Sequence, residues 1–433
     1  MLLSGKCAAE KVLVLGAGAA GLAAARQLSQ MGCSVTVLEA RDRVGGRIQT
    51  DRTLGVPIDL GANWIHGTEG NPIAELAEQL GLIHRPTALS KTDFYDFDGR
   101  PLTRAESQSL RKDFETLLKL EPQADADPAT DVTLAEAVDW LSPSQAVTDA
   151  RQRQLNWIRS ALAAYLGSGA TELSRGYLND DEEFPGSNNL IDEGYDAIAN
   201  ALARGIDIRL NHVAQRVIHR KDRVRVETKQ EAFSGDRAIV TLPLGVLKLG
   251  KLLFEPPLPK RKQQAIQNLG MGVLNKIVLR FPNAFWRPES DFLGYLSYRA
   301  SDSPLILNLL PYLHSPILTA FLGGPIAREQ EKQSDEQLTA HLLQELRCIF
   351  PRSVPEPTGI LVTRWASDAF SCGSYSFLPA GASSQDYSFL AEPVGGRLFF
   401  AGEATTRKHP ATVHGAYLSG LRVARQLEGV LRE

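Results

Sequence analysis

The sequence predicts an α/β protein of two interleaved domains, one of which contains a parallel sheet. Between residues 12 and 39 a strand, a helix and a second strand follow one another, and this βαβ unit builds parallel sheets. A further strand, a glycine turn and a helix occupy residues 397–425, at the opposite end of the chain. The chain between them changes from helical patterns over 76–195 to short strand-like runs over 206–298.

The individual elements are predicted from periodicity and from their boundaries. Residues 12–15 are an aliphatic run that ends at Gly16, and the alanine-rich segment 19–31 is a helix that ends at Gly32. A second strand covers residues 34–39. Further helices are expected at 110–120, 133–141, 151–167, 194–203 and 338–350, and further strands at 206–210, 213–218, 224–228, 238–242, 273–281 and 292–298.

Composition excludes several classes of protein. With 43% hydrophobic and 22% charged residues, the 433-residue chain is typical of a globular protein of two or three domains. Its 47 basic and 50 acidic residues give a net charge of −3, which argues against nucleic-acid binding. No apolar run approaches the roughly 20 residues that span a membrane. Four scattered cysteines without a CxxC pair indicate neither a disulfide framework nor a zinc site, and we expect no metal.

The N-terminus gives the only indication of location. Its first ten residues are too short and too weakly apolar for a complete signal peptide, so the cytoplasm is the expected compartment. A periplasmic or secreted location stays open if the N-terminus has been trimmed.

The motif Gly16-x-Gly18-x-x-Gly21 follows a strand and opens a helix. Gly16 allows a tight turn, Gly18 lets the backbone approach a pyrophosphate, and Gly21 lets the helix pack on the strand. The helix N-terminus attracts phosphate groups. Glu39, at the end of the second strand, can accept hydrogen bonds from ribose hydroxyls and would repel a 2′-phosphate. These features predict a dinucleotide site that disfavours NADP.

Four other segments contain candidate site residues. Arg41-Asp-Arg-Val-Gly-Gly-Arg47 is either a solvated basic turn or a loop that binds pyrophosphate through Arg47. Asp59-Leu-Gly-Ala-Asn-Trp-Ile-His66 has small residues where a backbone could pass close to a flat ring. Lys276 begins an apolar strand, where a lysine is often a solvated side chain. Residues 364–377 include Tyr375 in a glycine-bordered segment, which is either core or the wall of an amine site.

An acidic cluster follows the predicted helices. Asp180-Asp-Glu-Glu183 and Asp192-Glu193 lie in the part of the chain expected to bind substrate. A solvated loop is the simpler interpretation. An acidic funnel that attracts a polycation is the alternative.

Together, these motifs resemble the flavin-containing amine oxidases, a family that includes polyamine oxidases, monoamine oxidases and histone lysine demethylases. The resemblance covers residue 11 to the C-terminus. It implies a Rossmann-like FAD domain interleaved with an α+β substrate domain. The FAD domain would comprise residues 1–75, 196–255 and 393–433, and the substrate domain residues 76–195 and 256–392.

The resemblance also implies roles for individual residues. Lys276 corresponds to the lysine that holds a water beside the reactive nitrogen of the flavin. Tyr375 and Thr412 correspond to the two walls of the amine cage, and His66 to a substrate contact of polyamine oxidases. The expected FAD contacts are Gly16, Gly18, Gly21, Glu39, Arg41, Gly46, Arg47, Gly61, Ala62, Asn63, Trp64, Val213, Trp365, Gly402, Glu403, Thr412 and Val413.

Two departures from the family pattern narrow the expectation. Monoamine oxidases attach the flavin through a cysteine immediately before the tyrosine, and here that position is Ser374, with Cys372 two residues too early. FAD is therefore expected to bind non-covalently. The second cage wall is tyrosine in monoamine and plant polyamine oxidases, whereas here the matching position is Thr412, and histone demethylases share this threonine. The smaller side chain implies a wider slot, which favours a longer, flexible amine over a small aryl-amine.

The sequence is therefore expected to encode an FAD-dependent oxidase of polyamines such as spermine or spermidine. A hydride would pass from the carbon beside the amine to the flavin, with molecular oxygen as the electron acceptor and an aldehyde, an amine and hydrogen peroxide as products. An L-amino-acid oxidase is the alternative and would need an arginine such as Arg287 or Arg299 in the pocket. A non-catalytic flavin-binding protein is the other alternative, and the sequence does not indicate the oligomeric state.

Overall fold

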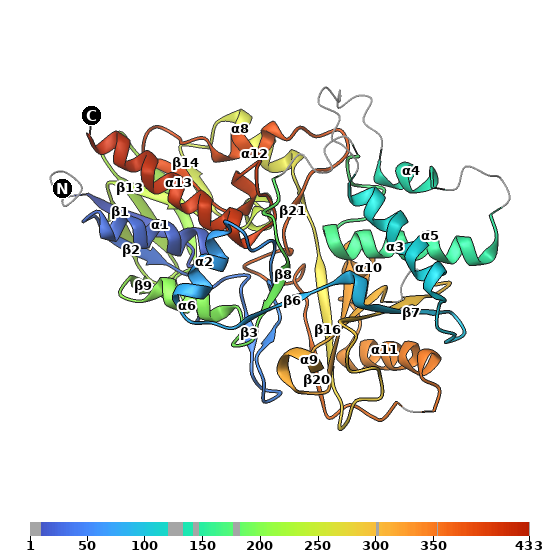
Figure 1. Cartoon of the computed structure of the whole chain (residues 1–433). Coiled ribbons are helices and arrows are strands. Elements are labelled where there is room, and N and C mark those ends of the chain that lie inside the picture. The colour runs from blue at the N-terminus through green and yellow to red at the C-terminus, as the bar shows by residue number, and fades with distance from the viewer. Residues whose placement is uncertain are drawn as a thin grey trace.

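The computed structural model describes residues 10–119, 133–141, 147–175, 182–299, 303–352 and 354–432. Two lobes lie side by side, and both ends of the described chain belong to the same lobe (Figure 1). The first lobe contains a parallel sheet and the second a larger mixed sheet with helices around it.

The five-stranded sheet of the first lobe joins segments from the whole length of the chain. Its order is β22 (Leu398–Phe400), β13 (Arg237–Val240), β1 (Lys11–Leu15), β2 (Ser34–Leu38) and β9 (Asp207–Arg209). All four neighbouring pairs are parallel. A strand that is buried on both faces of a sheet has apolar residues at consecutive positions, and residues 12–15 of β1 show this pattern.

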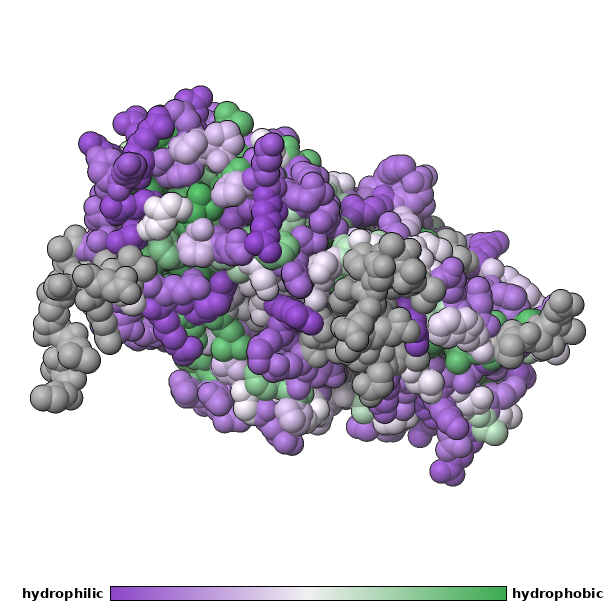
Figure 2. All heavy atoms as spheres, turned by 90° about the horizontal axis from the view of Figure 1, so that it is seen from above, coloured by the Kyte–Doolittle hydropathy of each residue, from purple (hydrophilic) through white to green (hydrophobic). Residues whose placement is uncertain are grey.

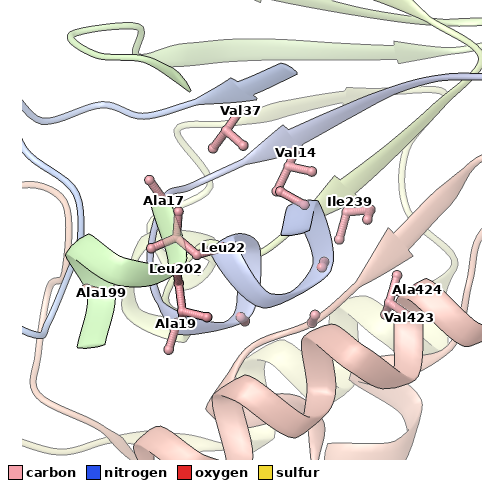
Figure 3. Packing of buried hydrophobic residues seen from close by; sticks show 14 of the residues in the cluster. Val14, Ala17, Ala19, Leu22, Val37, Ala199, Leu202, Ile239, Val423 and Ala424 are labelled. Carbon is pink, nitrogen blue, oxygen red and sulfur yellow. The ribbon is translucent and has the colours of Figure 1, made fainter. Parts of the chain in front are cut away.

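Four helices accompany this sheet: α1 (Ala19–Gln30), α2 (Pro72–Gln79), α6 (Asp196–Ala203) and α13 (Val413–Arg432). Val14, Val37 and Ile239 of the sheet belong to one core with residues of α1, α6 and α13 (Figure 3). Burial of each large aliphatic side chain contributes about 1.5–3 kcal/mol to stability. Helices α1 and α13 approach so closely that a Cβ on Gly420 would lie 2.2 Å from Ala20 O. The packing therefore joins the C-terminal helix to the first βαβ unit.

The second lobe is built on a six-stranded sheet. Its order is β20 (Gly359–Val362), β16 (Leu274–Arg280), β19 (Ile317–Gly323), β18 (Leu305–Asn308), β17 (Phe292–Leu296) and β7 (Thr92–Asp96). Its helices are α3 (Arg104–Leu118), α4 (Leu134–Asp139), α5 (Asp149–Leu166), α9 (Leu310–Leu313), α10 (Gly324–Gln330) and α11 (Asp335–Ile349). Capping boxes start three of these helices, with Thr103, Thr133 and Ser334 as the N-caps.

Smaller elements complete the two lobes. A four-stranded sheet contains β12 (Ala232–Gly235), β11 (Val224–Thr228), β10 (Ala214–His219) and β14 (Leu253–Glu255). A three-stranded sheet of β5 (Trp64–Ile65), β8 (Asn188–Ile191) and β6 (His84–Thr87) lies between the lobes (Figure 1). The remaining elements are the pairs β3 (Thr50–Asp51) with β4 (Ile58–Asp59) and β15 (Gly270–Met271) with β21 (Ser376–Phe377), and the helices α7 (Leu244–Lys248), α8 (Lys260–Asn268) and α12 (Gln385–Ala391).

The predicted α/β class is confirmed, and each predicted helix and strand has a counterpart in the described chain. The strands of the parallel sheet all come from segments assigned to the FAD domain, although the boundaries at residues 75, 195, 255 and 392 stay a prediction. Disulfides depart from expectation: Cys33 is disulfide-bonded, whereas Cys348 and Cys372 are free.

The surface is mainly hydrophilic in the view of Figure 2, where apolar residues are scattered in small groups. Within the described ranges, no helix is long and apolar enough to cross a bilayer. The same residues contain no group of three or more histidine, cysteine, aspartate or glutamate side chains that could hold a metal ion.

Candidate active site

Two glycine turns meet at the end of β1. Gly16 has a φ of +108°, in the region that favours glycine, and its N–H donates to Leu38 O at 2.8 Å. A Cβ on Gly21 would lie 1.9 Å from Gly16 O, so only glycine lets α1 start here. Gly18 forms a β-bridge with Gly45, and Gly46 has a φ of +59°. The structure therefore packs the two predicted phosphate-binding turns against each other.

Glu39 lies at the end of β2, beside these turns. Its carboxylate oxygens accept hydrogen bonds from Ala17 N at 2.7 Å and Arg41 N at 2.8 Å. A carboxylate oxygen has two lone pairs, so each can accept one further bond, as from a ribose hydroxyl. The Glu39 carbonyl also accepts from His212 N at 2.8 Å, which brings the adjacent Val213 to this end of the sheet.

The two predicted arginines have different surroundings. Arg41 forms a bidentate ion pair with Asp368 at 2.5 and 3.0 Å and donates to Ser371 Oγ at 2.9 Å. Arg47 donates to Ser374 O at 2.9 Å and pairs with Glu403 at 2.8 Å. Arg41 is thus held by the second lobe, and its expected contact with FAD stays a prediction.

Glu403, in a 3₁₀ turn over Glu403–Thr405, joins three segments of the chain. While Oε1 accepts from Arg47, Oε2 accepts from Ser376 N at 3.2 Å, Ser376 Oγ at 2.6 Å and Ala411 N at 3.1 Å. Ser376 follows Tyr375, and Ala411 precedes Thr412. One buried carboxylate oxygen therefore joins the chain next to Tyr375 to the chain next to Thr412, the two predicted walls of the amine cage.

Lys276 lies on β16 and is almost completely buried, with 2% of its surface exposed. Its Nζ donates to Asp59 O at 2.6 Å, Gly61 O at 2.7 Å and Asn63 Oδ1 at 2.5 Å. Burial lowers the pKa of Lys276 from its usual range, and the nearby Asp59 carboxylate opposes that shift. The three oxygens match the three protons of the ammonium form, whereas a neutral amine would turn its lone pair toward one of these acceptors.

The loop that accepts these bonds passes close to the second glycine turn. A Cβ on Gly61 would lie 1.8 Å from Arg47 O, and Ala62 N donates to the same oxygen at 3.1 Å. Trp365 Nε1 donates to Leu60 O at 3.1 Å. Trp64, by contrast, turns toward the second lobe, with its ring 5.5 Å from that of Phe321. Residues 59–63, hereafter the Lys276 loop, thus lie between the two lobes.

Tyr375 is fixed by the end of helix α5. Its hydroxyl donates to Tyr165 O at 3.1 Å, and a Cβ on Gly167 would lie 2.7 Å from the ring. Desolvation raises the pKa of Tyr375, so the phenol stays neutral at physiological pH. The Ser374 hydroxyl donates to Leu274 O at 3.1 Å and accepts from Leu274 N at 2.8 Å.

Thr412 and Val413 begin the long helix α13. The Thr412 hydroxyl donates to His409 O at 3.0 Å and accepts from Gly415 N at 2.9 Å, so it caps the helix. Gly402, on the turn after β22, has a φ of +135°, and an added Cβ there would meet no described atom within 4 Å.

His66 belongs to a cluster of aromatic rings near the start of α13. Its carbonyl accepts from Asn71 Nδ2 at 2.9 Å, and that amide also lies 3.4 Å from His414 Nδ1. His409 stacks on Phe184 with ring centroids 4.9 Å apart. Desolvation lowers the pKa of both His66 and His414, to about 3 for His414. We expect both rings to be neutral at physiological pH.

The acidic cluster is only partly described, since Asp180 and Asp181 lie outside the described residues. Glu182 pairs with Lys408 at 2.6 Å, and Asp192 pairs with Arg85 at 2.8 Å. The Glu193 carboxylate accepts from Ile83 N at 3.1 Å. These acids have partners in the protein, which fits a structural role better than an open funnel.

Sequence reasoning missed the residues that hold the site together. Arg43 donates to Val44 O, Gly46 O and Ile48 O and so fixes the second glycine turn. Asn275 Oδ1 accepts from Trp365 N at 2.9 Å, which ties β16 to the loop after β20. The basic turn indicated that Arg43 could belong to the site, whereas a single asparagine before Lys276 gave no indication of its role.

The whole chain was compared with known proteins. Residues 19–427 match the family of flavin-containing amine oxidoreductases. This chain belongs to that family. Polyamine oxidase 2 of Arabidopsis thaliana is 35% identical over 434 residues, which cover 97% of this chain and 88% of that protein. Lysine-specific histone demethylase 1 homolog 3 of Oryza sativa subsp. indica is 38% identical, over 95% of this chain and 53% of the demethylase.

The fold agrees with this assignment. A solved double mutant of putrescine oxidase superposes with a TM-score of 0.79 at 21% identity, covering 97% of this chain and 99% of that one. The predicted two-domain amine oxidase fold is therefore confirmed. As a flavin-containing amine oxidoreductase, the chain is an enzyme, and FAD is its cofactor.

The residues of the site fit FAD. Gly18 is the N-cap of α1, and no side chain of a described residue caps this end of the helix. The first backbone N–H groups of α1 can therefore bind a phosphate. Arg47, Gly402 and Glu403 also line a small pocket that is otherwise formed mainly by apolar residues such as Val240 and Leu242. Which of these residues touch FAD stays a prediction.

We predict that Glu403→Gln weakens both folding and FAD retention. The substitution keeps the shape but converts one acceptor oxygen into an NH₂ donor, which then faces groups that donate. Each buried group left without a partner costs about 1–3 kcal/mol. Thermal melting and FAD release on dilution would measure both effects.

Glu227→Gln is the matched control, because Glu227 pairs with Arg225 at 3.3 Å on the surface. Such surface pairs contribute roughly 0–1 kcal/mol. Equal behaviour of the two variants would contradict the role assigned to Glu403.

Proposed function

We propose that this flavin-containing amine oxidoreductase oxidises a polyamine such as spermine or spermidine. The observation that supports the proposal is that Ser376 and Ala411, the neighbours of Tyr375 and Thr412, donate to the same oxygen of Glu403. An aromatic wall opposite a small side chain leaves a slot for a long, flexible amine. A polyamine fits such a slot better than a small aryl-amine does.

The relatives support the same substrate class. The chain covers 88% of the Arabidopsis polyamine oxidase but only about half the length of the demethylases that it matches. A role in chromatin is therefore not proposed. The slightly acidic net charge of −3 also fits a cationic substrate and no nucleic-acid partner.

FAD held by the glycine turns and Arg47 would supply the redox chemistry, by which the amine is oxidised to an imine and molecular oxygen is reduced to hydrogen peroxide. In a separate step the imine hydrolyses to an aldehyde and an amine. The residues of the chain orient the substrate and control its protonation. An amine with a pKa of about 10.4 costs ~4 kcal/mol to neutralise at pH 7.4. An apolar cage, in which burial disfavours the charged form, would lower this cost.

Lys276 is the proposed catalytic residue on the flavin side. Its proposed role is to hold a water beside the flavin, for which one of its three hydrogen bonds to Asp59 O, Gly61 O and Asn63 Oδ1 would have to be exchanged for a bond to that water. His66 is proposed as a substrate contact.

The arginines considered for an L-amino-acid oxidase are placed unfavourably for a carboxylate clamp. Arg287 is 67% exposed and pairs with Glu289 at 3.4 Å and Asp93 at 3.8 Å. Arg299 is also exposed. A buried carboxylate clamp needs an arginine that is shielded from water. Neither of these exposed arginines meets this requirement, which argues against the L-amino-acid oxidase.

We predict that kcat/KM for hydrogen peroxide release is at least about tenfold higher with spermine or spermidine than with L-lysine. This ratio corresponds to ~1.4 kcal/mol of transition-state stabilisation. L-Lysine carries similar amino groups and adds the carboxylate that an amino-acid oxidase requires. A coupled peroxidase assay with spermine, spermidine, L-lysine, putrescine and acetylated polyamines measures the rates of hydrogen peroxide release. Faster turnover of L-lysine would establish the alternative.

FAD is proposed to bind non-covalently, because Ser374 cannot form a thioether and its hydroxyl is bonded to the backbone of Leu274. Acid precipitation of the purified yellow protein is expected to release FAD into the supernatant. Flavin that stays with the pellet would show a covalent link elsewhere.

A further inference from the structure

Two side chains of the second lobe hold three successive carbonyl groups of the Lys276 loop. Lys276 Nζ donates to Asp59 O at 2.6 Å and to Gly61 O at 2.7 Å. Between these two oxygens, Leu60 O accepts from Trp365 Nε1 at 3.1 Å. The tryptophan is 6% exposed, so its indole N–H needs a partner inside the protein. The loop is therefore held by a lysine and, independently, by a neutral donor.

The bond from Trp365 does not have to break during the reaction. The proposed role of Lys276 requires that it exchange one of its three bonds for a bond to a water, which leaves one oxygen of the loop without its lysine partner. The bond from Trp365 Nε1 to Leu60 O can hold the loop through that exchange. Trp365 can do this only if its own backbone is fixed beside Lys276.

Asn275 joins the backbone of Trp365 to the strand that contains Lys276. Its Oδ1 accepts from Trp365 N at 2.9 Å and from Thr363 Oγ1 at 3.3 Å. Thr363 is also bonded to the lysine backbone, because its Oγ1 accepts from Lys276 N at 2.8 Å and its N–H donates to Lys276 O at 3.0 Å. Asn275 is 3% exposed, so these bonds are shielded from water.

Glu331, the C-cap of α10, holds Asn275 in turn. Its Oε1 accepts from Asn275 Nδ2 at 2.7 Å and from Ala366 N at 2.8 Å. Its Oε2 accepts from Ser367 N at 2.8 Å and from the Ser367 hydroxyl. The Glu331 carbonyl accepts from Arg364 Nε at 3.2 Å. One residue therefore binds the chain on both sides of the tryptophan, through carboxylate bonds that are stronger than those between neutral groups.

The carboxylate also determines which way the Asn275 amide faces. An amide has an acceptor oxygen at one end and a donor NH₂ group at the other, whereas an ionised carboxylate only accepts. Glu331 therefore binds the NH₂ end, which directs the oxygen toward Trp365 N. With the opposite orientation, two donors would face each other at the tryptophan and two acceptors at the glutamate.

We propose that Glu331 and Asn275 are positioning residues of the oxidation reaction. Through Trp365 they keep the Lys276 loop in place on the glycine turn of the first lobe while Lys276 exchanges a bond for a water. Their effect on the reaction rests on the proposed function of Lys276. Their hold on the loop rests on the contacts alone.

The first test measures the loop directly and needs no amine. Glu331→Gln keeps the shape of the side chain but turns one acceptor oxygen into a donor, so it can no longer accept at both ends. The N–H groups of residues 60–62, which donate to Gln49 O and Arg47 O, report on opening of the loop. By hydrogen–deuterium exchange of the FAD-bound enzyme, we expect them to exchange at least about fivefold faster in this variant. Unchanged exchange would overturn the proposal.

The second test is kinetic. Stopped-flow absorbance follows flavin reduction by spermine and, after reduction with dithionite, flavin re-oxidation by oxygen. We expect Glu331→Gln to slow the same half-reaction as Lys276→Met, by at least about threefold, with the spermine concentration for half-maximal reduction within about twofold of wild type.

Faster loop exchange with both half-reactions unchanged would show a purely structural role and would overturn the proposal. If Lys276→Met slowed neither half-reaction, the function of Lys276 and this positioning role would fail together. The exchange measurement would separate that result from a failure of the contacts themselves.

A paired substitution tests whether the two residues act through each other. Asn275→Asp places a second carboxylate beside Glu331, and like charges repel. Adding Glu331→Gln supplies an NH₂ donor to the new carboxylate. We expect the double variant to recover at least about threefold in the affected half-reaction relative to Asn275→Asp alone. No recovery would contradict the pairing.

Glu345→Gln is the matched control. Glu345 is buried on α11, and its carboxylate accepts from Ser303 N at 3.1 Å, so it holds a backbone N–H outside the chain around Lys276. Its substitution should leave both the exchange of the Lys276 loop and the half-reactions unchanged. Equal changes in both variants would show a general effect of losing a carboxylate in this lobe and would contradict the proposal.

Discussion

The contact between Lys276 and its loop is the constraint on which the rest of the site depends. A buried amine must satisfy its hydrogen-bond donors inside the protein, and here three oxygens of residues 59–63 do so at 2.5–2.7 Å. Lys276 belongs to the sheet of the second lobe, whereas the loop packs on the glycine turn of the first through Gly61 and Arg47. One side chain therefore fixes the two lobes relative to each other at the place where the amine and the flavin must meet.

Glu403 and Arg47 fix the opposite side of the site in a similar way. Their ion pair is largely buried, and the further donors from Ser376 and Ala411 satisfy the remaining carboxylate oxygen. A buried pair is favourable only when such additional hydrogen bonds offset the loss of hydration. Removing one partner is therefore expected to disturb three chain segments together. The cage positions Tyr375 and Thr412 depend on this arrangement, although neither touches Glu403 through its own side chain.

The sequence predicted the features that depend on neighbouring residues. The glycine turn, the first βαβ unit and the strand with Lys276 follow from local spacing, and Gly16 and Gly21 have the close contacts that this spacing requires. The resemblance to a family identified residues 59–67 and 397–413 as parts of the site. The pairing of Arg41 with Asp368 could not be predicted, because its partners are 327 residues apart and no local pattern links them.

The central claim is that the amine of Lys276 acts in the reaction and is not merely a structural lysine. Stopped-flow measurement of flavin reduction by amine and of re-oxidation by oxygen in Lys276→Met tests it most directly, with Lys262→Met as the control. Lys262 is equally buried, and its Nζ donates to Phe389 O and Leu390 O, so both variants lose bonds to buried carbonyls. We expect both variants to retain FAD, and only Lys276→Met to lose at least about tenfold in one or both half-reactions, equivalent to ~1.4 kcal/mol. Rates within about twofold of wild type in both half-reactions of Lys276→Met would contradict the claim.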